Sequence, residues 1–153
     1  MRSLVAKAVG SVLGVGYLPF ASGTFGSLVA ALAYLFIPAL TQLQWLLPLI
    51  VASSLLGVWA GGVMEEAYGE DPSAAVIDEL AGQWVALVAL PASPLAVLLS
   101  FLLFRLYDIW KPGLVDRAQS LPGGWGIMTD DLLAGLLANF SVRLLLLVLP
   151  FFS

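Results

Sequence analysis

The sequence predicts an all-α, multi-pass membrane protein made of about five hydrophobic helices. Of its 153 residues, 61% are hydrophobic and 10% are charged, whereas a soluble domain averages roughly 45–50% and about 25%. Residues 8–64 contain no Asp, Glu, Lys or Arg, and neither do residues 80–104. Because a helix needs about 20 apolar residues to cross a bilayer, the first stretch has room for two spans and the second for one span or a tight hairpin.

The composition also excludes several kinds of chemistry. The chain has no His and no Cys, so disulfides, imidazole or thiolate metal ligands, cysteine nucleophiles and serine–histidine triads are absent. A net charge of −4 disfavours nucleic acid as a partner. An enzyme with this composition must work with carboxylates, hydroxyls, backbone groups and a few cations.

The amino-terminal segment, residues 1–16, carries two basic residues and then a weakly apolar, glycine-rich stretch. We expect an amphipathic or irregular lead-in here. A signal peptide cleaved near Ala21 is the alternative, but Lys7 and three glycines interrupt the apolar centre that such a peptide needs.

Two apolar helices are predicted next, at residues 25–37 and 43–64. Pro38 ends the first one. The second contains Gly57 and Gly61, a small-xxx-small pattern that allows another helix to approach closely in lipid. Turn and capping residues precede the first helix, among them Ser22, Thr24 and Ser27.

Three further helices are predicted at residues 76–90, 95–110 and 130–149, and all five belong to one domain spanning residues 1–153. Pro91 and Pro94 separate the first two, and a polar connection precedes the last. Three of the five helices have only 13 to 16 residues, about 20–24 Å against a hydrocarbon core of roughly 30 Å. They either tilt in a thinned bilayer, or the helices at 76–90 and 95–110 form a hairpin that does not cross fully.

The basic residues predict which end of the bundle faces the cytoplasm. With a cytoplasmic amino terminus and alternating helices, five of the six basic residues lie on or near that side. Arg143, close to the end of the last helix, would extend toward the opposite headgroups. The same alternation brings the helix starts at Thr24, Asp78 and Asp130 to one membrane surface.

Two pairs of adjacent acidic residues stand at predicted helix starts, Asp78–Glu79 and Asp130–Asp131. Carboxylates there interact favourably with the helix macrodipole by about 0.3–1 kcal/mol, which is one explanation of the pairs. Metal binding is the other, because carboxylates repel one another and two pairs brought together favour a divalent cation. Oxygen-only ligands indicate Mg²⁺, ahead of Mn²⁺ or Ca²⁺.

Glycines and cations surround these acids in the sequence. Gly82 and Gly135 follow Asp78 and Asp131 by four residues, so each lies on the same helix face as its acid and predicts close helix packing beneath it. Further along, the spacing of three charged residues allows either a plain surface ion pair or a cationic clamp beside the carboxylates; they are Arg105, Asp108 and Lys111.

The segment Gly-Thr-Phe-Gly-Ser, residues 23–27, opens the first helix. Its free backbone N–H groups and the positive end of the dipole suit an oxyanion, although such a segment also caps many helices. With the acids and cations, it predicts a metal-and-phosphate site at a membrane surface, for which a lipid phosphate is the natural substrate.

Four segments of the chain strongly resemble the phosphatidylglycerophosphatase A family. They are ASGTFGSL at 21–28, IDELAG at 77–82, FRLYDIWKP at 104–112 and GGWGIMTDDLLAG at 123–135. The resemblance covers residues 18–135 in the family's order and spacing. It implies a bacterial inner-membrane enzyme, with its active site facing the cytoplasm, that removes the terminal phosphate of phosphatidylglycerophosphate with Mg²⁺ to give phosphatidylglycerol and inorganic phosphate.

We expect Mg²⁺ to bind the terminal phosphate while a water attacks phosphorus in line; a covalent aspartyl-phosphate is the alternative route. The expected metal ligands are Asp78, Glu79, Asp130 and Asp131. These four are also expected to be catalytic, together with Asp108, which orients Arg105 or acts as base. The expected substrate-binding residues are Thr24, Ser27, Arg105 and Lys111.

Two other functions fit the same residues. One is a broader lipid phosphatase or pyrophosphatase. The other is a small transporter or channel subunit with an acidic ion-binding site, although transport sites usually lie near the bilayer midplane and these charges lie at helix ends. The sequence makes no prediction about the oligomeric state.

Overall fold

The computed structural model describes residues 2–69 and 72–148, and within them the protein is all-α with no strand. The order is α1 (Arg2–Gly10), η1 (Val15–Tyr17), α2 (Ser22–Phe36), η2 (Pro38–Thr41), α3 (Leu43–Tyr68), α4 (Ile77–Leu87), α5 (Pro94–Trp110), α6 (Leu114–Gln119) and α7 (Gly124–Val148), where η marks a short 3-10 helix. The predicted all-α class is therefore confirmed. The predicted end of the last helix at Leu149 lies outside the described residues.

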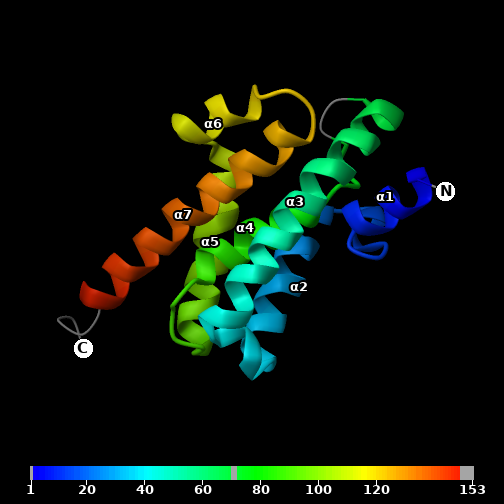
Figure 1. Cartoon of the computed structure of the whole chain (residues 1–153). Helices are drawn as coiled ribbons and strands as arrows, with labels where there is room; N and C mark the ends of the chain where they lie inside the picture. The colour runs from blue at the N-terminus through cyan, green and yellow to red at the C-terminus, as the bar shows by residue number, and fades with distance from the viewer. Residues whose placement is uncertain (1, 70–71, 149–153) are drawn as a thin grey trace.

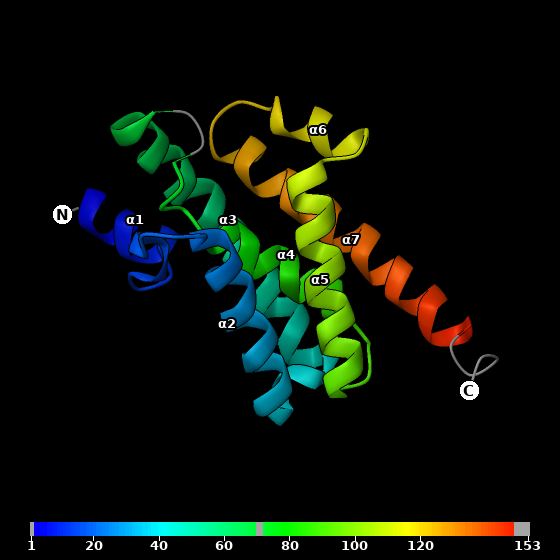
Figure 2. The ribbon, with the colours of Figure 1, turned by 180° about the vertical axis from the view of Figure 1, so that it is seen from behind.

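The short helix α4 lies at the centre of the molecule, surrounded by α2, α3, α5 and α7 (Figures 1 and 2). Eight of its 11 residues are buried. At 1.5 Å per residue it is only about 16 Å long. Because its neighbours enclose it, α4 holds its acidic first turn inside the bundle rather than on the surface.

Glycines allow α4 and α7, the pair in most extensive contact, to approach closely. A Cβ atom on Gly82 would lie 2.6 Å from the backbone oxygen of Asp131 and 2.7 Å from a ring carbon of Phe104. A Cβ atom on Gly135 would collide with the backbone oxygen of Gly82. The close packing predicted beneath Asp78 and Asp131 is confirmed.

At the carboxyl end of α4, side chains from α7 donate hydrogen bonds to backbone carbonyl groups. The amide nitrogen of Asn139 donates to the carbonyl oxygens of Ala86 and Val88, both at 2.9 Å. Arg143 donates to the carbonyl oxygens of Val88 and Ala89 at 2.9 and 3.3 Å. The last turn of a helix leaves carbonyl groups without intrahelical partners, and here α7 supplies donors to Ala86 in that turn and to the two residues that follow the helix.

The structure corrects the predicted start of the last helix and the polar connection before it. Asp130 and Asp131 do not begin α7 but lie in its second turn, because the helix starts at Gly124. Gly124 packs directly on the backbone of Val58 in α3, so this glycine-rich part of the predicted polar connection is a helix–helix contact. The connection itself contains α6, which the sequence did not predict.

Other boundaries agree more closely with the prediction. The helix at 25–37 is α2, which ends before Pro38, and the helix at 95–110 is α5, whose Ser93 side chain accepts a hydrogen bond from the backbone N–H of Ala96. The helix at 43–64 continues for four more residues as α3. The irregular or amphipathic lead-in contains the regular helix α1, which packs against α3.

Two helices in the described part of the chain, α3 and α7, are long and apolar enough to cross a membrane. Only 28% of the most apolar window of each is buried, so these helices are not the enclosed core of a soluble protein. Large apolar side chains instead face outward on both, including Leu47, Val51, Leu55, Leu136, Phe140 and Leu144. This surface indicates a membrane-associated helical protein; the number of crossings, about five, stays a prediction.

We expect Gly82→Ala to lower the free energy of unfolding by about 1–3 kcal/mol, because the added methyl group must push α7 and Phe104 away from α4. The matched control is Gly62→Ala in α3, whose Cβ would meet nothing closer than the backbone nitrogen of Gly124 at 3.7 Å. Melting temperatures in detergent should fall for the first variant and hold or rise for the second. Equal melting temperatures would contradict the close α4–α7 contact.

Candidate active site

Three carboxylates from two helices meet where α4 begins. Asp78 and Glu79 come from the first turn of α4, and Asp131 comes from the second turn of α7. One oxygen atom from each of the three lies within 4.8 Å of the others. We call the three side chains of Asp78, Glu79 and Asp131 together the carboxylate group. Asp78 and Asp131 are buried, and Glu79 is partly exposed. The predicted convergence of the two acidic pairs is therefore confirmed for three of the four acids.

The oxygen atoms of this carboxylate group lack the partners that buried polar atoms usually have. Among the described residues, no hydrogen-bond donor reaches the buried Oδ1 of Asp78, Oε2 of Glu79 or Oδ2 of Asp131. Burying several carboxylates together without counter-charge is costly. A set of only oxygen ligands, buried and unsatisfied, fits a hard divalent cation such as Mg²⁺.

Asp130 differs from the other three acids, because both of its carboxylate oxygen atoms accept hydrogen bonds. Its Oδ2 accepts a hydrogen bond from Nζ of Lys111 at 2.5 Å, and its Oδ1 accepts one from the backbone N–H of Asp131 at 3.0 Å. It lies outside the group of three, so its role as a metal ligand stays a prediction. Burial acts to lower the pKa of Lys111, but the hydrogen bond and charge of Asp130 outweigh burial and raise that pKa, which keeps Lys111 cationic.

Arg105 lies between two acids at the edge of the carboxylate group. Its guanidinium forms an ion pair with Asp108, three residues further along α5, and lies 4.0 Å from Oε1 of Glu79. The side chains of Arg105 and Asp108 are only 16% and 13% exposed, so this is not a plain surface pair. The buried Nε of Arg105 has no hydrogen-bond acceptor among the described residues, which leaves a donor for a substrate oxygen.

The amino end of α2 reaches the same place. A Cβ atom on Gly23 would collide with Oε1 of Glu79 and would lie 3.3 Å from Nη1 of Arg105, so a larger residue here would displace the Glu79 carboxylate. No side chain caps the start of α2, and the first N–H groups of a helix have no intrahelical partner.

Thr24 lies in this first turn and is partly exposed, whereas Ser27 is fully buried and donates its hydroxyl to the Gly23 carbonyl at 2.9 Å. Substrate contact by either residue stays a prediction.

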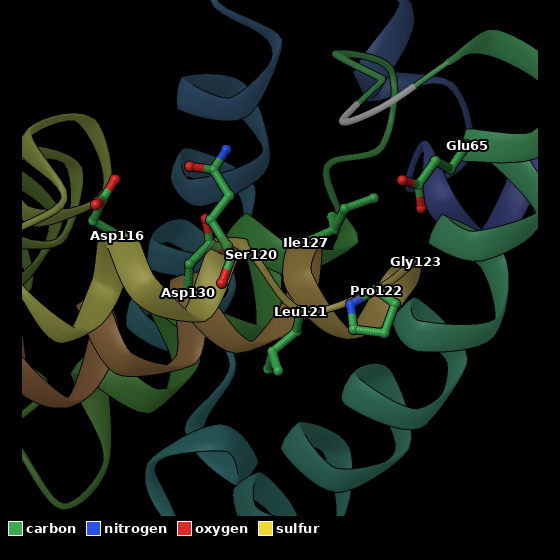
Figure 3. A pocket seen from close by; sticks show the side chains of 9 residues that line it. Glu65, Asp116, Ser120, Leu121, Pro122, Gly123, Ile127 and Asp130 are labelled. Atoms are coloured by element: carbon green, nitrogen blue, oxygen red, sulfur yellow. The ribbon is translucent and has the colours of Figure 1, made fainter.

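A cavity of about 530 Å³ is lined by Asp130, the chain neighbour of Asp131, and we name it the α6 cavity after the helix that forms one wall. Figure 3 shows its lining side chains, with Asp116 and Asp130 on one side and Glu65 on the other. The lining residues are Glu65, Asp116, Gln119, Ser120, Leu121, Pro122, Gly123, Ile127 and Asp130. Of these, only Asp130 was predicted as a site residue. Asp116 stands in a polar connection whose sequence has no motif beyond its charge, and α6, which positions it, was not predicted.

The fold and the site together define a class of protein: a membrane-associated helical protein whose carboxylates and cations suit chemistry on a phosphate ester. Comparison with known proteins then gives the family. The family model of Phosphatidylglycerophosphatase A matches residues 8–146, and the chain belongs to this family. It is therefore a phosphatase, and the alternative of a transporter or channel subunit is set aside.

Three relatives illustrate this similarity. The chain is 39% identical over 140 residues to a putative phosphatidylinositol-3-phosphatase of Bacteroides thetaiotaomicron, covering 87% of this chain and 88% of the relative. It is 36% identical to the phosphatidylglycerophosphatase A of Escherichia coli, covering 82% and 74%. It is 34% identical to that of Haemophilus influenzae, covering 84% and 81%. No solved structure matches the chain significantly.

We expect the carboxylate group to bind a divalent cation and Asp78→Asn or Asp131→Asn to weaken that binding at least about tenfold, because each removes a charged ligand. Electron paramagnetic resonance of Mn²⁺, a spectroscopically visible substitute for Mg²⁺, measures the affinity in detergent. Glu66→Gln removes the same charge from an exposed position on α3 and serves as the control. Unchanged affinity in both Asp variants would contradict a cation site here.

Proposed function

We propose that this phosphatase hydrolyses the terminal phosphate monoester of phosphatidylglycerophosphate with the help of a Mg²⁺ ion, releasing phosphatidylglycerol and inorganic phosphate. The single observation that carries the metal-dependent mechanism is the group of three carboxylates, each with a buried and unsatisfied oxygen atom. Family membership supports the substrate.

Asp78, Glu79 and Asp131 would hold the ion, with Asp130 as a further candidate beside them. A divalent cation at this position supplies charge neutralisation for the phosphate and for the oxygen atoms that gain charge as the phosphorus–oxygen bond breaks. Its oxygen-only ligand set is the one that Mg²⁺ prefers. The chain contributes the rest of the reaction through side chains and backbone groups around the ion site.

Two cationic side chains and one helix end bind and orient the phosphate. Arg105 directs its unpaired Nε toward a non-bridging oxygen, and its pair with Asp108 holds the guanidinium in place. Lys111, kept cationic by Asp130, adds positive charge from the other side. The N–H groups at the start of α2, near Thr24, donate to the remaining phosphate oxygen. Phosphoryl transfer depends mainly on positioning and on such electrostatic stabilisation.

A water molecule attacks phosphorus on the side opposite the glycerol oxygen, and the bond between phosphorus and that oxygen breaks. The water loses a proton and the glycerol oxygen takes one up, so the lipid leaves as the free alcohol and the phosphate as inorganic phosphate. Asp108 acts in this proposal by orienting Arg105, since its carboxylate is already paired with the guanidinium. The covalent route through an aspartyl-phosphate is the competing mechanism, and trapping of a phosphorylated protein after acid quench would distinguish it from direct attack by water.

The second candidate substrate is an inositol lipid phosphorylated on its ring. It is favoured by the 39% identity with a putative phosphatidylinositol-3-phosphatase. Both substrates present a phosphate monoester on the alcohol of a phospholipid headgroup, so the same carboxylates and cations would serve either one. Parallel rates on the two lipids decide between them.

We expect the purified protein in detergent micelles to release phosphate from phosphatidylglycerophosphate, and to lose this activity when a chelator removes divalent cations. Asp131→Asn and Arg105→Gln should each lower kcat by about 10²–10³-fold, the size of effect found when one stabilising group is removed from a transition state. Malachite green detection of phosphate measures the rates.

The control for those variants is again Glu66→Gln, which should retain full activity because Glu66 is exposed outside the site. Near-normal rates in Asp131→Asn would defeat the proposed mechanism. Faster release from phosphatidylinositol 3-phosphate than from phosphatidylglycerophosphate would reassign the substrate and leave the mechanism intact.

We also propose that the protein lies in the bacterial inner membrane with the site facing the cytoplasm. The chain has no Cys, so single cysteines can be introduced at Ser120, on the site end, and at Gln42, at the opposite end of α3; both are exposed. In intact spheroplasts a membrane-impermeant maleimide should label Gln42→Cys and spare Ser120→Cys until the membrane is permeabilised. The opposite pattern would invert the proposed orientation.

A further inference from the structure

We propose that the α6 cavity binds the alcohol portion of the lipid headgroup, and that Asp116 accepts a hydrogen bond from the free hydroxyl group next to the phosphorylated carbon. This inference rests on the proposed function and adds a specificity-determining residue to it. The cavity, at about 530 Å³, lies in the range of volumes that hold small polar ligands.

The position of the cavity supports this assignment. It is lined by Asp130, whose neighbour Asp131 belongs to the carboxylate group. Asp116 projects on the same side of the cavity as Asp130 in Figure 3. The residue before it, Val115, packs in one cluster with Ala134, one turn beyond Asp130 on α7. In this proposal, a phosphate bound at the carboxylate group extends its alcohol past Asp130 into the cavity that Asp116 lines.

The charges in the cavity determine what it can bind. Three carboxylates line it, those of Glu65, Asp116 and Asp130, and its lining includes no Lys or Arg. Among the described residues, neither Glu65 nor Asp116 takes part in an ion pair, whereas Asp130 is occupied by Lys111. Acidic walls disfavour an anion inside the cavity, so the phosphodiester of the lipid would lie outside it. They accept hydrogen bonds from hydroxyl groups, which are the polar atoms of glycerol and of inositol.

A hydrogen bond to a charged acceptor raises the binding affinity about tenfold or more. We therefore expect Asp116→Ala to raise KM for phosphatidylglycerophosphate about tenfold while kcat changes less than twofold. An analogue in which 1,3-propanediol replaces the headgroup glycerol lacks the hydroxyl. The wild type should bind this analogue about tenfold more weakly, and Asp116→Ala should make its binding no weaker.

Glu65→Ala is the matched control, because it removes a carboxylate from the far side of the same cavity. If the cavity acted only through its net charge, both variants would lower KM, since each reduces repulsion of an anionic lipid. If Asp116 instead recognises the hydroxyl group, Asp116→Ala raises KM, and Glu65→Ala does not. Inhibition by inorganic phosphate, which needs only the carboxylate group and the cations, should stay within twofold in both variants.

Comparing the two lipid substrates shows whether the cavity binds glycerol or inositol. With phosphatidylinositol 3-phosphate, whose ring carries several hydroxyl groups, both Asp116→Ala and Glu65→Ala should raise KM. Melting temperatures confirm that the variants fold; should Asp116→Ala fail to fold, Asp116→Asn and the wild-type response to the propanediol analogue still test the inference.

Equal KM values for the glycerol and propanediol lipids in the wild type, or a lowered KM in Asp116→Ala, would overturn this inference while leaving the proposed phosphatase activity in place. Absence of phosphate release from every lipid by the wild type would instead refute the proposed function itself.

Discussion

Mutual repulsion among Asp78, Glu79 and Asp131 is the constraint on which the rest of the structure depends. Three carboxylates within 4.8 Å of one another separate unless something holds the helices that carry them. The Gly82–Gly135 contact brings α4 and α7 together directly beneath the acids, and apolar packing on every side of α4 holds it there. The fold thus supplies the close approach, and a bound cation would relieve the repulsion that this approach creates.

Much of this arrangement can be predicted from the sequence, and particular residues show why. The acidic pairs, the glycines four residues after Asp78 and Asp131, and the prolines that end or start helices are local signals with a direct structural meaning. The predicted start of α7 was wrong because residues 123–126 match the local pattern of a flexible loop. The packing of this segment on α3, which makes it part of a helix, is not visible in the local sequence. The α6 cavity could not be predicted, since its walls come from three segments and Asp116 lies in no motif.

One end of the site is buried in apolar surroundings, and the other end is polar. Asp78 and Asp131 are buried at the head of an apolar bundle, whereas the α6 cavity, with Glu65, Asp116 and Ser120 around it, is polar. A phospholipid has the same division, with chains that stay in hydrocarbon and a headgroup that stays in water. The outward-facing leucines of α3 and α7 suit the chains. The phosphate would then meet the carboxylates at the boundary, where removing water strengthens each electrostatic contact.

The hydrogen bonds from Asn139 and Arg143 to the end of α4 have a consequence for biogenesis. α4 is synthesised well before α7, yet carbonyl groups at its carboxyl end depend on α7 for hydrogen-bond donors, and α7 carries Asp131, the third acid beside Asp78 and Glu79. In a nascent chain that ends before α7, α4 therefore lacks these hydrogen-bond donors and the carboxylate group lacks Asp131. Under the proposed mechanism, such truncated products of interrupted translation would be inert toward the surrounding lipids.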